Sequence, residues 1–253
     1  MMELLNRLRL KNKPLYYFGW FNLIFAFGCL LMMQFDNTKI LGINAWIKPM
    51  KFFLSVGIFS FTMAWFLPLL ELPKKSRLYS YIVILVLALE NIIITHQAWK
   101  GTTSHFNVST KFNGYLFMAM GVAIMILTMW TAYITLLFFR KKNFSIPGPY
   151  LWGIRIGLLI FVLFALEGIV MVIMMSHTVG GADGGKGLFF VNWSRDYGDL
   201  RAAHFFGMHA LQILPLIGYY LCKTNRQMIL YGILYFFMVA ALLMQALLGH
   251  PII

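Results

Sequence analysis

Acidic residues are scarce in this sequence, which contains 8 Asp and Glu against 21 Lys and Arg. Charged residues of both signs make up only 11% of the 253 residues, whereas 60% are hydrophobic. A soluble globular protein usually carries about a quarter charged residues, so this composition argues against a soluble fold. No polar stretch is long enough to form a separate soluble domain. We therefore expect a single integral membrane domain that covers residues 1–253.

Cysteine is also scarce, and its scarcity excludes two kinds of framework. Only Cys29 and Cys222 are present, at opposite ends of the chain, so no disulfide scaffold or CxxC metal pair is visible. Walker, Rossmann and serine-elbow motifs are missing as well. The formal charge of +13 does not indicate a nucleic-acid partner, because the basic residues lie between apolar runs, where they orient a membrane protein.

Long apolar runs are what the sequence has in abundance. A hydrocarbon core about 30 Å thick requires about 20 apolar residues in a helix. Seven segments are long enough, and they cover residues 17–33, 46–70, 78–99, 114–139, 151–176, 200–222 and 228–249. These segments predict an all-α polytopic transmembrane bundle of seven helices, with the lipid bilayer as its partner.

The distribution of Lys and Arg predicts the orientation of this bundle. If the N-terminus is inside, the cytoplasmic side holds 13 Lys and Arg and the outer side holds 8. Loops rich in Lys and Arg stay on the cytoplasmic side of a membrane. We therefore expect a cytoplasmic N-terminus and, with seven helices, an extracytoplasmic C-terminus. The residue usage resembles that of a bacterial inner (plasma) membrane protein, which is the localisation we expect.

Histidine is distributed asymmetrically in this topology. All six histidines fall in the predicted outer half: His96, His105, His177, His204, His209 and His250. The longest outer connection, 177–199, is also the richest in glycine and polar residues. The predicted cytoplasmic loops are short and basic, as simple connectors are. We therefore expect a functional site at the outer face.

Two glutamates and one histidine lie deep in the predicted helices. Glu90 and Glu167 each fall nine residues before the outer end of a span, about 14 Å down at 1.5 Å per residue, and His209 reaches a similar depth. Ionisable groups in a bilayer are costly and usually face the bundle interior or a cavity. The two glutamates share the context Ala-Leu-Glu-x-Ile, a hint of a repeat between the third and fifth helices. Glu90 and Glu167 are the predicted catalytic residues.

These side chains favour a metal or haem site. His204, His209, Glu90 and Glu167 are the candidate ligands of a divalent metal, zinc or iron. Zinc would make the protein a hydrolase, with Glu90 or Glu167 as general base. His96 and His204 are the candidate axial ligands of haem b, which would indicate a redox role. His204 and His209 diverge by about 140° on a straight helix, so other helices would have to complete a metal site.

Cations at the predicted outer mouth indicate the kind of ligand that would approach. Lys48, Lys51 and Arg201 lie near the outer ends of their helices. They would attract a small anionic ligand or a lipid headgroup, or neutralise the two glutamates.

Two other functions fit the same residues. Glu90, Glu167 and His209 could form the relay of a proton-coupled transporter or carrier. Alternatively, the buried ionisable residues form an interhelical hydrogen-bond network that only fixes packing, made by Glu90, Glu167, His204 and His209. A retinal protein is set aside, because the last predicted helix, 228–249, contains no lysine to hold retinal.

Overall fold

The computed structural model describes residues 2–252, and the side chains of residues 5–252. The chain divides into two compact units, Met1–Leu127 and Thr128–Ile253, and the boundary falls inside helix α5 (Lys111–Arg140). Within residues 2–252, six helices are long and apolar enough to cross a membrane. The predicted multi-pass helical membrane protein is confirmed at this level.

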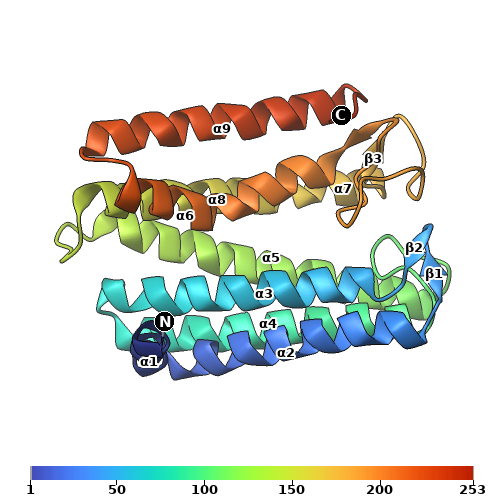
Figure 1. The fold of residues 1–253 in the computed structure, drawn as a ribbon, viewed down its shortest axis with the longest axis horizontal. Helices are drawn as coiled ribbons and strands as arrows, with labels where there is room; N and C mark the ends of the chain where they lie inside the picture. The colour runs from blue at the N-terminus through green and yellow to red at the C-terminus, as the bar shows by residue number, and fades with distance from the viewer. Residues whose placement is uncertain (1, 253) are drawn as a thin grey trace. The chain divides into compact units, whose positions relative to one another are not determined.

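The first unit contains three of these helices before α5 (Figure 1). They are α2 (Lys13–Phe35), α3 (Ile47–Phe66), which η1 (Leu67–Leu70) continues, and α4 (Pro73–Trp99). α2 begins where Asn12 accepts a hydrogen bond from the backbone N–H of Leu15, an ordinary N-cap. A short hairpin of β1 (Lys39–Ile40) and β2 (Ile43–Asn44) joins α2 to α3.

The second unit contains α6 (Gly148–Leu166), α7 (Gly168–Met174), α8 (Leu200–Tyr220) and α9 (Asn225–Leu247). The connection from α7 to α8 includes two paired strands, β3 (Thr178–Val179) and β4 (Gly198–Asp199). α9 starts with a capping box of Thr224 and Gln227, which satisfies its first backbone N–H groups.

The sixth predicted span, 200–222, corresponds to α8, which is helical but is not one of the six apolar helices. Its 21 residues are enough to cross a bilayer, but Arg201, both histidines and Gln212 reduce its apolar character. α8 nevertheless packs against both α6 and α9. The seven-span count and the orientation of the termini therefore stay predictions.

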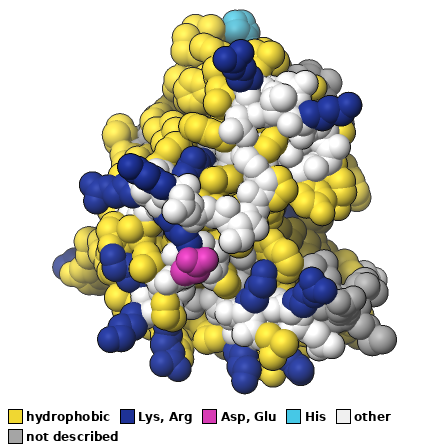
Figure 2. Space-filling model, turned by 90° about the vertical axis from the view of Figure 1, so that its left-hand side faces the viewer, with side chains coloured by type: hydrophobic (Ala, Val, Ile, Leu, Met, Phe, Trp, Pro, Cys, Tyr) yellow, Lys and Arg dark blue, Asp and Glu magenta, His cyan; other side chains and the backbone are white. Residues whose placement is uncertain are grey.

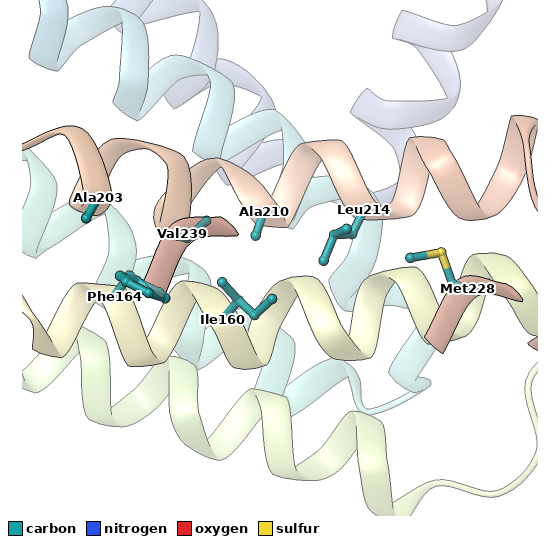
Figure 3. Packing of buried hydrophobic residues seen from close by; sticks show 7 residues of the cluster. All are labelled: Ile160, Phe164, Ala203, Ala210, Leu214, Met228 and Val239. Atoms are coloured by element: carbon teal, nitrogen blue, oxygen red, sulfur yellow. The ribbon is translucent and has the colours of Figure 1, made fainter. Parts of the chain in front are cut away.

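Small residues bring α6 and α8 into close contact. A Cβ atom added at Gly153 would lie 2.6 Å from the Leu214 carbonyl oxygen, and one at Gly157 would lie 2.7 Å from that of Ala210. Glycines four apart on one helix allow this backbone approach in membrane proteins. α9 completes the core of the unit in Figure 3, which is formed by Ile160, Phe164, Ala203, Ala210, Leu214, Met228 and Val239.

Arg155 caps the C-terminal end of α5. Its Nε donates to the Phe138 carbonyl at 2.9 Å and its Nη2 to the Lys141 carbonyl at 3.0 Å. The last carbonyls of a helix have no partner within the helix and carry partial negative charge, so a guanidinium stabilises them. The guanidinium also lies 5.3 Å from the ring centre of Trp152. This single arginine therefore ties α6 to the end of α5.

Candidate functional site

Glu167 lies at a local irregularity of the predicted fifth span. α6 ends at Leu166 and α7 begins at Gly168, and the Val170 N–H donates to the Glu167 carbonyl at 2.8 Å, one residue closer along the chain than in an α-helix. Glu167 itself keeps helical backbone angles, and the two segments form one apolar span, Gly148–Met174. The Glu167 side chain is buried, with only 4% of its surface exposed. A buried carboxyl group thus lies at a single tightened turn within a helical span.

His204 is the partner of this carboxyl group. Its Nδ1 lies 3.1 Å from Glu167 Oε2, while Glu167 Oε1 is buried without a hydrogen-bond partner among the described residues. His204 is five residues into α8, and its ring lies beside Gly168, 3.7 Å from where a Cβ would stand. Its side chain is 32% exposed, so the histidine extends from the surface of the unit to the buried carboxyl group.

His209, which the sequence placed at the depth of the glutamates, has different neighbours. Its Nδ1 lies 3.3 Å from Gln212 Oε1, and its ring centre lies 4.3 Å from that of Phe205. The hydrogen bond to Glu167 comes instead from His204, a histidine that the sequence assigned to metal or haem binding. Depth along a helix identified the glutamate correctly as buried, but it did not identify its partner.

Glu90 lies in the first unit, within the uninterrupted helix α4. It is buried, with 4% of its surface exposed, and its Oε1 has no hydrogen-bond partner among the described residues. Lys48, in the first turn of α3, interacts with it electrostatically. The next residue, Asn91, donates to Asn22 on α2 at 2.7 Å. Glu90 and Glu167 therefore share a local sequence but differ in local structure, since Glu90 lies within a regular α-helix and Glu167 lies at a turn tightened by an i→i−3 hydrogen bond.

The predicted metal site is not supported by the described donors. Among residues 2–252, no three His, Cys, Asp or Glu side chains gather where they could hold one metal ion. Zinc or iron would need such a set, and the Glu167–His204 pair offers only two donors. The two candidate haem ligands belong to different units, His96 to the first and His204 to the second, so that pair stays a prediction. The ring of His96 lies 6.4 Å from that of Trp99.

Three cations were predicted at the outer mouth of the site. One of them, Arg201, contacts the loop that precedes α8. It forms an ion pair with Asp199, at 2.6 Å from Nη2 to Oδ2, and Nη2 also donates to the Asn192 carbonyl. Asp199 caps α8 as well, since its side chain accepts a hydrogen bond from the Arg201 backbone N–H, as its position in the sequence predicts. Lys48 and Lys51 lie half-buried in the first turn of α3.

A second histidine–carboxylate pair lies in the loop before α8. His177 Nδ1 lies 2.6 Å from Asp183 Oδ2, and the backbone N–H groups of His177 and Thr178 also donate to this carboxylate. Burial raises the pKa of the Asp183 carboxyl, but the hydrogen bonds and the charge of His177 outweigh burial and hold that pKa well below its usual range. The Asp183 carboxylate is therefore negatively charged, and its hydrogen bonds hold residues 176–183 in a turn.

Comparison with known proteins does not assign this site. No protein-family model, curated protein or solved structure matches the chain.

Proposed function

We propose that this protein is a proton-coupled membrane carrier in which Glu167 and His204 bind and pass on the coupling proton. The observation that carries the proposal is the 3.1 Å hydrogen bond between His204 Nδ1 and the buried Oε2 of Glu167, made where α6 meets α7. Ionisable groups inside membrane helices are costly, and proton relays are one of the functions that retain them.

The two side chains differ in exposure, His204 at 32% and Glu167 at 4%. We assign His204 as the group that takes up the proton first and Glu167 as the buried group that receives it. Imidazole is suited to this step, because one ring nitrogen can accept a proton while the other donates one. Transfer from Nδ1 to Oε2 leaves a neutral histidine and a neutral carboxylic acid.

The short segment after the glutamate is the element that we propose to move in coupling. α7 is only 7 residues long and follows Glu167 directly, after the tightened turn closed by the Val170 N–H. Protonation of Glu167 would change its hydrogen bond with His204. Because His204 lies on α8, this would also change how strongly α8 interacts with α7. Glu90, buried beside Lys48 in the first unit, is the candidate for a second proton site.

The proposed orientation places the Glu167–His204 pair toward the outside of a bacterial inner membrane, with α8 counted as the sixth of seven spans. The excess of Lys and Arg in the predicted cytoplasmic loops supports this orientation. A reporter fused after Ile253 should give an extracytoplasmic signal, whereas a cytoplasmic signal would reverse the orientation.

Glu167→Gln is the variant that tests the carrier function. Glutamine keeps the shape of the side chain and a hydrogen bond to His204, but it does not titrate. In proteoliposomes that enclose a pH-sensitive dye, we expect proton entry after an acid jump to fall about a hundred-fold, the low end of what a positioned acid–base group contributes. The infrared difference spectrum of the same jump should lose the band of a protonated carboxyl group.

Matched substitutions at exposed positions control for the change in charge and for the preparation of the variant proteins. Glu71→Gln and His250→Gln change the same residue types on the surface and should behave like the wild type in both measurements. His204→Gln should slow proton entry while the melting temperature stays within a few degrees. If Glu167→Gln conducts protons and shows the carboxyl band as the wild type does, the pair has only a packing role.

A further inference from the structure

The first turn of α4 carries charges of the wrong sign for a helix start. Lys74, Lys75 and Arg77 are exposed there, the first turn contains no acidic residue, and the N-cap residue Leu72 makes no side-chain hydrogen bond to it. The N-terminus of a helix carries a partial positive charge, so cations in this turn are unfavourable to the helix itself. Cations at this end of a span orient a membrane protein, and at the membrane surface the same cations attract anionic groups outside the protein.

The N-terminal helix α1 (Met2–Lys11) places more cations at the same end of the first unit. Figure 1 shows α1 nearly end-on, whereas α2, α3 and α4 run across the view, so α1 crosses the end of these helices. Leu8 on α1 is buried, at 7% exposed, while Arg7 and Arg9 are exposed. α1 therefore packs Leu8 against the first unit and exposes its two arginines.

Two contacts fix α1 in this crosswise position. Asn12, directly after α1, donates from Nδ2 to Ser80 Oγ at 2.8 Å, which joins the start of α2 to the second turn of α4. The Lys11 ammonium lies 4.0 Å from the ring centre of Trp65 near the end of α3. Because the α1–α2 joint is tied to α4, the cations of α1 and those of the first α4 turn belong to one surface.

We call this surface the basic patch and define it by its exposed cations, Arg7, Arg9, Lys13, Lys74, Lys75 and Arg77. Glu71 is the only acidic residue in the neighbouring segments 5–16 and 66–82. Figure 2 shows the corresponding end of the molecule, where Lys and Arg side chains are abundant and acidic ones are scarce. Leu10, 72% exposed at the end of α1, adds an apolar side chain beside these charges.

We propose that the basic patch is a binding site for anionic phospholipid headgroups. The spanning helices hold the patch at the level of the membrane surface, where the phosphates of such lipids lie. Basic clusters on an amphipathic helix or next to a spanning helix attract anionic lipids. The cations of α1 and α4 contact the phosphates, and Leu10 enters the boundary between headgroups and acyl chains. The site lies in the first unit and does not depend on the Glu167–His204 pair.

Binding of phosphatidylglycerol by the full-length protein in detergent tests this site, with phosphatidylcholine as the neutral comparison. Native mass spectrometry of protein titrated with each lipid gives the two affinities. We expect the wild type to prefer phosphatidylglycerol by at least about ten-fold. The triple substitution Lys74→Gln, Lys75→Gln, Arg77→Gln should remove most of this preference, and the double substitution Arg7→Gln, Arg9→Gln should remove part of it.

The matched control removes three exposed cations from loops and helix starts of the second unit: Lys142→Gln, Lys223→Gln and Arg226→Gln. It should keep the wild-type preference within about three-fold. Equal affinity of the wild type for both lipids would overturn the proposal, as would an equal loss in the control and the α4 variant. Melting temperatures without added lipid show whether each variant is folded, and if the α4 triple variant is not, the α1 double variant decides the question.

Discussion

Replacing Gly157 with alanine is expected to destabilise the protein by about 1–3 kcal/mol, and replacing it with leucine is expected to prevent folding. The added Cβ would lie 2.7 Å from the Ala210 carbonyl oxygen, which belongs to the backbone of α8 and cannot rotate away. The two helices would have to separate, and the packing of the second unit around them would be lost. The melting temperature in detergent, followed by size-exclusion chromatography of heated samples, measures the effect.

Gly121 on α5 provides the matched control for this substitution. A Cβ at Gly121 would meet nothing within 4 Å. Alanine is a better helix former than glycine, so Gly121→Ala should leave the melting temperature unchanged or raise it slightly. Opposite signs at two helical glycines would show that close packing, rather than helix propensity, decides the outcome. Equal effects at both positions would contradict the close contact of α6 with α8.

The same contact matters for the candidate site. α6 ends beside Glu167 and α8 carries His204, so the spacing of these helices sets the distance between carboxyl group and imidazole. Gly207, one turn beyond His204, packs directly against Phe164 of α6. Gly157→Ala is therefore expected to impair proton binding at Glu167 as well as stability, although it removes no ionisable group.

Asp199→Ala is expected to cost about 2–4 kcal/mol and to loosen the loop that precedes α8. The carboxylate, 2% exposed, accepts hydrogen bonds from the backbone N–H of Ser194 at 2.7 Å and from Arg201 Nη2 at 2.6 Å. Its removal leaves Arg201 without its counter-ion and α8 without its N-cap. Because Arg201 is 27% exposed, water replaces part of the lost interaction, which keeps the cost below that of a fully buried pair.

Asp196→Ala, in the same loop, separates a general charge effect from this specific one. Asp196 is exposed, so its loss should change the melting temperature little. Limited proteolysis of both variants should show faster cleavage within 184–198 for Asp199→Ala only. His204 lies just over one turn beyond Asp199, so a slower proton response at Glu167 should accompany the loosened loop. A proteolysis rate equal to that of the wild type would show that Asp199 does not hold the loop.

The close packing of α6 and α8 had a signal in the sequence that depth alone did not use. Gly153 and Gly157 are four apart on α6, the spacing of a close helix contact.

The sequence by itself determined that the chain is a helical membrane protein, because apolar composition and length along the chain are enough to identify spans. It also indicated that Glu90 and Glu167 are buried, since both lie well inside an apolar span, but it did not indicate the burial of Asp199. Only the tertiary structure decided that His204, and not His209, hydrogen-bonds Glu167. Two histidines 140° apart on a helix differ in direction more than in depth, and their direction depends on how α8 packs against α6. That packing is set by backbone contact at small residues, which hydropathy does not reveal.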